Sequence, residues 1–225
     1  MKIFLIRHGE QQYPYDEQGR KLVSSPSAPL AGLGRIQLKE LGKKMTEEGL
    51  IFDALYISPV LRTQQSAGIL ADVLSIPNKF TMDGLKEVFP NSAEGKTYDE
   101  LEAMGGDIYA HPLGEDQESL DHLVERSREA MEFIVKDARE RGYRSVGIVG
   151  HGDPLCALQW TMRHEGFPAS YNDMKNGFYP QKGQAYEYSF SDEEPFRLTG
   201  EGRTITTEAA VSTMEGFRNS NKEVQ

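Results

Sequence analysis

The chain has 225 residues, one cysteine, a mean hydropathy of −0.56 and a formal net charge of −10 at pH 7. This length is enough for one α/β domain with a sizeable core. The acidic balance excludes general nucleic-acid binding, which relies on lysine and arginine side chains that neutralise backbone phosphates. It leaves room for a small phosphorylated ligand held by a local cluster of arginines.

The apolar segments are short, since KIFLI and VGIV fall far below the roughly 20 residues that cross a bilayer. KIFLI runs directly into Arg7 and His8, without the small-residue cleavage site of a signal peptide. A lone Cys156 has no internal disulfide partner, which agrees with a reducing compartment. We therefore expect a cytoplasmic protein without membrane contact. A homodimer is compatible with the sequence.

The first predicted element is a short buried strand over Lys2–Arg7, which ends abruptly at the pair His8-Gly9. A polar loop dotted with Pro and Gly follows over Gln11–Pro29. The next segment, Leu33–Glu48, is predicted to be a helix because apolar residues recur at helical spacing, at Leu38, Leu41 and Met45.

A second strand is predicted over Ala54–Ser58. Pro59 is placed just inside the start of the following helix, where its missing N–H costs nothing. Ala67, Leu70 and Leu74 mark the buried face of that helix. The stretch Phe80–Asp116 is rich in Gly, Pro and Asp, so it is predicted to be irregular and to form a cap.

A long amphipathic helix follows, with one apolar stripe formed by Leu120, Leu123, Val124, Ala130, Ile134 and Ala138. Arg144–Gly150 is the third predicted buried strand, and Asp153-Pro154 opens another helix. Alternation of Tyr186, Tyr188 and Phe190 with polar residues predicts a half-buried strand near a sheet edge. Beyond Thr199 the chain turns polar, and residues 215–225 are expected to fray.

Alternating strands and helices predict a three-layer α/β/α sandwich with a mostly parallel sheet, formed by a single domain over residues 1–225 with a cap at about 80–118. Ligands of such sheets bind outside the carboxyl ends of the strands. Here three predicted strands end in residues capable of chemistry: Arg7-His8, Ser58 followed by Arg62, and His151. The sequence therefore predicts one pocket at these strand ends.

Two observations raise this prediction above chance. An Arg and a His at the end of an apolar strand are costly to bury unless something pairs with them. A loop that merely contains both explains Arg7-His8 alone, but the second pair at His151-Gly152 makes coincidence a poor explanation. Arg62 lies in the first turn of a helix, where a cation is unfavourable. An anion shared with the helix terminus explains this placement, and a solvated surface arginine is the alternative.

Five segments resemble motifs of the histidine phosphatase superfamily, the phosphoglycerate-mutase-like proteins, and they occur in the family's order. LIRHGE resembles the signature around the phosphorylated histidine, and VGIVGHGD resembles the strand of the second histidine. The other three are PLAGLGRIQLKELG (Pro29–Gly42), YISPVLRTQQSA (Tyr56–Ala67) and LKEVFPNSAEG (Leu85–Gly95). The resemblance implies a phosphoglycerate-mutase-like fold.

The resemblance also implies roles for individual residues. His8 would attack phosphorus and form a phosphohistidine. Arg7 and Arg62 would bind the phosphoryl oxygens, and His151 would add a further donor. Glu87 would be the general acid that protonates the leaving alcohol. Gly152 and Gln11 are added to the expected phosphate-binding set.

The sequence departs from the family pattern at three places. Asp153 follows the second His-Gly pair, either as the N-cap of the next helix or as a second acid or specificity residue. The loop QQYPYD lacks the Asn that many members use to contact phosphate, so Gln11 or Gln12 is expected to substitute. The segment GKTYDE lacks a common Trp.

No metal and no cofactor are predicted. His111, His122 and His164 show no metal-ligand spacing with one another or with Cys156. A Walker-type glycine-rich loop is absent, which argues against a nucleotide kinase.

The segment Lys96–Gly150 is shorter than the basic lid of the family's mutases and carries an acidic run. This favours a phosphatase that acts on a small phosphorylated metabolite, with a phosphopeptide as another possible substrate. A phosphoglycerate-type mutase is the alternative, and an inactive module that binds phospho-ligands is the second alternative.

Overall fold

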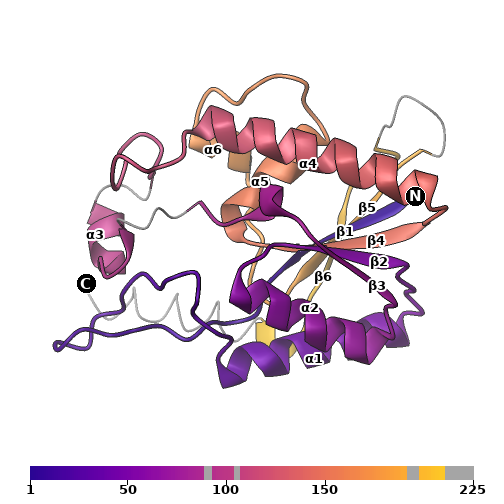
Figure 1. The fold of residues 1–225 in the computed structure, drawn as a ribbon, viewed down its shortest axis with the longest axis horizontal. Helices are drawn as coiled ribbons and strands as arrows, with labels where there is room; N and C mark the ends of the chain where they lie inside the picture. The colour runs from indigo at the N-terminus through magenta and orange to yellow at the C-terminus, as the bar shows by residue number, and fades with distance from the viewer. Residues whose placement is uncertain (89–92, 104–106, 192–197, 211–225) are drawn as a thin grey trace.

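The computed structural model describes residues 1–88, 93–103, 107–191 and 198–210. Their centre is one six-stranded sheet in the order β3-β2-β4-β1-β5-β6 (Figure 1). The strands are β1 (Lys2–Arg7), β2 (Ala54–Ile57), β3 (Asn78–Thr81), β4 (Ser145–Gly150), β5 (Ala185–Ser189) and β6 (Arg203–Ile205). The first four run parallel to one another, and β5 and β6 are added in antiparallel pairing.

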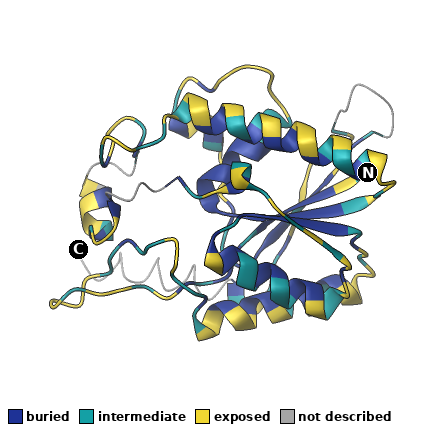
Figure 2. Ribbon diagram, in the orientation of Figure 1, coloured by how far each residue is buried: buried dark blue, intermediate teal, exposed yellow. Residues whose placement is uncertain are grey.

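Helices cover both faces of the sheet, which confirms the predicted three-layer sandwich (Figure 1). One face is covered by α1 (Gly32–Glu47) and α2 (Leu61–Leu74), the other by α4 (Leu120–Glu140) and α5 (Gly152–Thr161). Side chains of β1 alternate between the faces, because Ile3 and Leu5 join one apolar cluster while Phe4 and Ile6 join the other. Burial of each of these side chains contributes about 1.5–3 kcal/mol to the free energy of folding, relative to leaving it exposed to water. Figure 2 shows that the sheet at the centre is largely buried, whereas the helices on its two faces carry exposed residues on their outer sides.

The predicted cap contains a short helix, α3 (Tyr98–Ala103), which lies to one side of the sandwich (Figure 1). A 3₁₀ turn, η1 (Asp83–Leu85), precedes it, and a further short helix, α6 (Tyr171–Lys175), lies beyond α5. Leu101, Ile108 and Leu113 of the cap pack in a third apolar cluster with residues of α4 and α5. The cap segment is therefore docked on the sandwich by apolar contacts of its own.

Two strands differ from the sequence prediction. β3 pairs with β2 in parallel, so Phe80 and Thr81 belong to the sheet and not to an irregular cap. β6 pairs with β5 in the segment that was expected to be merely polar. Both are edge strands of four residues or fewer, too short to show a readable alternation. Residues 215–225, which were expected to fray, lie outside the described residues.

The position predicted for Pro59 is also wrong. α2 begins at Leu61 and its N-cap is Val60, so Pro59 lies outside the helix. Arg62 nevertheless lies in the first turn, as predicted. Within the described ranges, no helix combines the length and apolar character needed to cross a membrane.

The loop after β1 packs closely against α1 at two glycines, Gly9 in the loop and Gly34 in the helix. A Cβ atom on Gly34 would come within 2.1 Å of the Glu10 carbonyl oxygen, and one on Gly9 within 2.4 Å of the Gly34 oxygen. The Glu10 amide donates to Gln37 Oε1 at 2.8 Å, and the Ala31 amide donates to the Glu10 oxygen at 2.9 Å. The backbone around His8 is thus held against the helix at van der Waals distance.

We predict that Gly34→Ala destabilises the protein by at least about 1–3 kcal/mol, because a backbone oxygen must move to admit the methyl group. Gly32→Ala is the matched control on the same helix, since no atom of the described residues lies within 4 Å of its added Cβ. This control should be neutral or stabilising by up to about 1 kcal/mol. Urea unfolding measures both, and equal effects would contradict the proposed close approach.

Candidate active site

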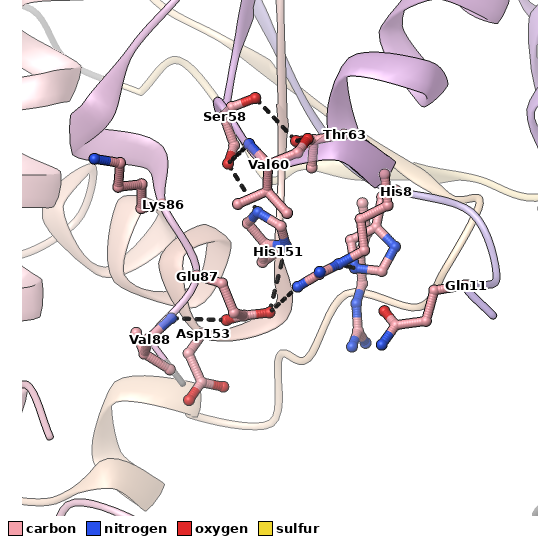
Figure 3. Close-up of polar contacts among 12 residues, drawn as sticks. His8, Gln11, Ser58, Val60, Thr63, Lys86, Glu87, Val88, His151 and Asp153 are labelled. Carbon is pink, nitrogen blue, oxygen red and sulfur yellow. Dashed lines mark hydrogen bonds and ion pairs between the residues drawn. The ribbon is translucent and has the colours of Figure 1, made fainter. Parts of the chain in front are cut away.

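The carboxyl ends of β1, β2 and β4 meet at one edge of the sheet, because Arg7 is in register with Gly150 and Ile57 with Val149. His8, Ser58 and His151 each follow one of these strands directly. Arg62 comes from the first turn of α2, and Glu87 comes from the chain just after η1. Figure 3 shows His8, His151 and Glu87 gathered at this edge. The predicted pocket therefore brings together residues far apart in the sequence.

His8 is 1% exposed and has a defined tautomer. Its Nδ1 lies 2.7 Å from the Gly9 carbonyl oxygen, which only accepts hydrogen bonds. Nδ1 must therefore carry the proton, and Nε2 keeps its lone pair. Arg62 Nε donates to that Nε2 at 3.3 Å. The Nε2 lone pair of His8 thus accepts a hydrogen bond from a guanidinium in the centre of the site.

His151 is completely buried, and the centroid of its ring lies 5.2 Å from that of His8. Its Nε2 lies 2.8 Å from the hydroxyl oxygen of Ser58. When that hydroxyl donates, Nδ1 of His151 carries the ring proton. Nδ1 is 3.3 Å from Glu87 Oε2, but the geometry is not that of a hydrogen bond, so Nδ1 has no hydrogen-bond partner among the described residues.

Burial sets the protonation states of these groups. It lowers the pKa of His8 and of His151 well below the usual value, and the nearby Arg62 guanidinium lowers both further. Burial raises the pKa of Glu87, and this outweighs the opposing effect of Arg62. The site therefore favours two neutral imidazoles beside a carboxyl group that retains its proton more readily than usual.

Three buried nitrogens of the described site have no hydrogen-bond partner: Arg7 Nε, Arg62 Nη1 and His151 Nδ1. The last of these is a donor when the Ser58 hydroxyl donates to His151 Nε2. Arg62 is only 3% exposed, so water does not readily satisfy it. A buried donor without a partner costs about 1–3 kcal/mol. Several such nitrogens in one buried site, beside two guanidinium groups, are typical of a site for an anion with several acceptor oxygens, such as a phosphoryl group.

His8, Glu87 and His151 also offer ligand atoms that lie within 4.8 Å of one another, a spacing that suits a metal ion. Arg62 contacts two of the three, at 3.3 Å from His8 Nε2 and 3.4 Å from Glu87 Oε2. A permanent guanidinium charge at that distance opposes a dication and favours an anion. The donor set fits an anion better than a metal.

The two further residues of the expected phosphate-binding set are placed differently. Gln11 is buried, but its side-chain amide nitrogen donates to Ser24 Oγ, and in Figure 3 it lies on the opposite side of His8 from Glu87. Gly152 is the first residue of α5, beside His151. Gln12, the alternative to Gln11, is exposed.

The expectation that Asp153 is the N-cap of α5 is wrong. The helix begins at Gly152, and its N-cap is His151, which makes no side-chain capping hydrogen bond. Asp153 is buried, and its carboxylate accepts hydrogen bonds from the hydroxyl groups of Tyr109, Tyr171 and Tyr179. Since these tyrosines come from three separate segments, no local pattern in the sequence indicated them.

Sequence reasoning also missed two other side chains. Ser58 was noted as a strand end, but its contact with His151 was not foreseen. Lys182 forms a 2.9 Å ion pair with Glu10 and donates to the Tyr13 hydroxyl. Burial lowers the pKa of Lys182 to about 8, although the Glu10 carboxylate opposes this. A lone lysine in a loop carries no sequence signal for such a position.

A cavity of about 450 Å³ adjoins Arg62 and Glu87. Its wall is formed mainly by the loop 23–27 and by Pro59–Leu61, and combines apolar side chains with three serines. Lys86 and Glu94 add one charge of each sign. The space next to the anion site therefore suits an uncharged, partly apolar group.

Comparison with known proteins agrees with this geometry. The model of the histidine phosphatase superfamily (branch 1) matches residues 3–175. Broad-specificity phosphatase YOR283W of Saccharomyces cerevisiae is 27% identical over 180 residues, which cover 75% of this chain and 73% of the yeast protein.

Solved structures share the fold at low identity. The α-ribazole phosphatase from Shigella flexneri has a TM-score of 0.67 at 21% identity, over 92% of this chain and 96% of that one. A mycobacterial glucosyl-3-phosphoglycerate phosphatase in complex with VO₃ has a TM-score of 0.68 at 19% identity, over 92% of this chain and 98% of that one.

We predict that orthovanadate, an analogue of a phosphoryl group in transfer, binds at the three unpartnered nitrogens and raises the melting temperature. Arg62→Ala should weaken this binding by about 10–100-fold, the loss expected for charge-assisted hydrogen bonds. Arg35→Ala, which removes an exposed arginine of α1, is the control and should bind as the wild type does. Equal affinity in all three proteins would contradict the assignment of the anion site.

Proposed function

The chain belongs to the histidine phosphatase superfamily, and we propose that it is a phosphatase that hydrolyses phosphomonoesters through a phosphohistidine on His8. The observation that carries the proposal is the state of His8. Its proton is held on Nδ1 by the Gly9 carbonyl group, and Nε2 accepts a hydrogen bond from Arg62 Nε in the same site as the unpartnered nitrogens of Arg7, Arg62 and His151.

In the first step, the Nε2 lone pair of His8 forms a bond to phosphorus while the bond from phosphorus to the ester oxygen breaks. Arg7, Arg62 and His151 stabilise the charge on the three equatorial oxygens. Glu87 gives its proton to the departing alcohol. Burial lowers the pKa of His8 and raises the pKa of Glu87, so the two shifts widen the pH range in which a neutral His8 and a protonated Glu87 coexist.

In the second step, water attacks the phosphorus of the phosphohistidine from the side that the alcohol has left. The Glu87 carboxylate accepts a proton from this water, and the nitrogen–phosphorus bond breaks. His8 returns to its neutral form, and inorganic phosphate is released. Glu87 thus acts as acid and then as base, which restores the starting state.

The cavity beside Glu87 is where the alcohol part of the substrate would lie. Its mixed apolar and hydroxyl lining suits the alcohol of a small phosphorylated metabolite better than a second strongly anionic group. A phosphatase is therefore favoured over a mutase that must hold a bisphosphate. The broad-specificity name of the yeast relative and the sugar phosphoester in the name of the mycobacterial neighbour support this class.

His8→Ala should lose essentially all turnover and remain folded. His111→Ala, a change at an exposed histidine, is the control and should keep full activity. Rapid quench with ³²P-labelled substrate should trap an acid-labile label on His8. A label on any other residue would refute the assignment of the nucleophile.

Glu87→Gln should lower the rate on alkyl phosphates by about 10²–10⁴-fold, because an alkoxide leaves poorly without a proton. The loss on p-nitrophenyl phosphate should be much smaller, since its phenolate leaves unaided. Arg62→Ala should slow both substrates alike. If Glu87→Gln slows both substrates equally, Glu87 is a positioning residue and not the general acid. If Asp153→Asn instead slows alkyl phosphates much more than p-nitrophenyl phosphate, Asp153 is the general acid.

Turnover should be unchanged in the presence of a chelator, because two arginines supply the positive charge that Mg²⁺ gives to kinases, and neutral His151 adds a hydrogen-bonding group. Dialysis against EDTA, followed by assay on an alkyl phosphate, measures this. Loss of activity that a divalent metal restores would contradict the metal-free mechanism.

A further inference from the structure

The proposed mechanism makes no use of the buried carboxylate of Asp153. Resting on the proposed function, we infer that Asp153 is a positioning residue that acts through Tyr179 to hold Arg7 ready for the phosphoryl group. This role differs from those considered on the sequence, which were the N-cap, a second acid and a specificity residue.

Asp153 has both carboxylate oxygens occupied by tyrosine hydroxyls. Tyr171 and Tyr179 donate to Oδ1 at 2.8 and 3.1 Å, and Tyr109 donates to Oδ2 at 2.9 Å. Asp153 is 6% exposed, so water contributes little to this cluster. A carboxylate that accepts three hydroxyl hydrogen bonds is engaged as an acceptor on both oxygens, which leaves it badly placed to deliver a proton to a leaving group.

Tyr179 connects this carboxylate to the anion site. The Arg7 guanidinium lies over the Tyr179 ring, with 5.2 Å between Cζ and the ring centroid. The next residue, Pro180, accepts a 2.8 Å hydrogen bond from Arg7 Nη1 through its carbonyl oxygen. One ring face and one carbonyl group therefore fix the plane of the guanidinium, and its buried Nε is left without a partner.

Gly152 makes this arrangement possible. A Cβ atom at that position would lie 2.3 Å from the Tyr179 hydroxyl oxygen, so the hydroxyl reaches Asp153 only across a residue without a side chain. Gly152 of the second His-Gly pair thus leaves room for Tyr179, which supports Arg7, the residue before the first pair.

Holding Arg7 in advance has a clear physical benefit. A free arginine side chain carries about 2 kcal/mol of rotamer entropy, and some of it must be lost when the guanidinium binds an anion. A guanidinium that a fixed ring already holds in place loses less rotamer entropy on binding, so the anion binds more tightly. Tyr179 is itself 37% exposed, and its hydrogen bond to Asp153 keeps the ring in place.

The chain contains a matched control for this claim. Tyr171 donates to the same oxygen of Asp153 as Tyr179 does, but its ring packs against Tyr109 and Lys175. Tyr171→Phe and Tyr179→Phe therefore each remove one hydrogen bond to Oδ1, and only the second touches the support of Arg7. A purely structural role for Asp153 predicts the same result for both.

The experiment measures orthovanadate affinity and thermal stability in the wild type, in Tyr171→Phe and in Tyr179→Phe. Both variants should lose similar stability. Tyr179→Phe should raise the Kd for orthovanadate by about 10-fold, a part of what a hydrogen bond to a charged group provides. Tyr171→Phe should change it by less than about twofold. Turnover of alkyl and aryl phosphates should fall in parallel in Tyr179→Phe, unlike in Glu87→Gln.

A double-mutant cycle tests whether Asp153 affects orthovanadate binding through Tyr179. Asp153→Ala should weaken orthovanadate binding in the wild type and add nothing in a Tyr179→Phe background. Equal weakening by the two tyrosine variants, or an additive loss in the cycle, would overturn the inference. A wild-type protein that binds no orthovanadate would instead overturn the proposed function, so the two failures are distinguishable.

Discussion

The hydrogen bond from His8 Nδ1 to the Gly9 carbonyl oxygen decides which ring nitrogen of the histidine is available for chemistry. It joins a side chain to the backbone of the very next residue, so it depends on the path of the chain after β1. That path is fixed by the contact of Gly9 with Gly34 and by the hydrogen bond from the Glu10 amide to Gln37. A packing constraint between a loop and a helix thus sets the tautomer of a buried imidazole.

Electrostatics then determines what the site accepts. The chain carries a net charge of −10, yet the centre of this site holds two arginines and two imidazoles kept neutral by burial. Among the described residues, Glu87 is the carboxylate that contacts Arg62, and burial raises its pKa. An anion therefore meets positive charge and donors at the site itself, whatever the charge of the whole surface.

The spacing of apolar residues in the sequence predicted the long helices and the strands that are buried on both faces of the sheet. Lys2–Arg7 is a strand with the predicted bounds, and α4 has the predicted apolar stripe. The edge strands β3 and β6 were missed because four or fewer residues show no period. Pro59 was misplaced because a proline just before a helix and one at its first position look alike in sequence.

The sequence could likewise predict only some residues of the site. Arg7, His8, Arg62 and His151 could be predicted to lie together because each is at or shortly after the end of a strand, and a parallel sheet brings these ends to one edge. Glu87 had no pattern of its own and was identified only through the family resemblance. The tyrosines around Asp153 come from segments whose meeting depends on how the cap and the loop before β5 pack, which no local pattern encodes.

The state of His8 is the central claim, and ¹⁵N NMR of histidine-labelled protein tests it most directly. The signals of His8 are identified by their absence in a His8→Gln variant. The account predicts a neutral ring with the proton on Nδ1, unchanged as the pH falls through about 6.5, the value for a free histidine. A ring that is doubly protonated at that pH, or one that carries its proton on Nε2, would contradict it.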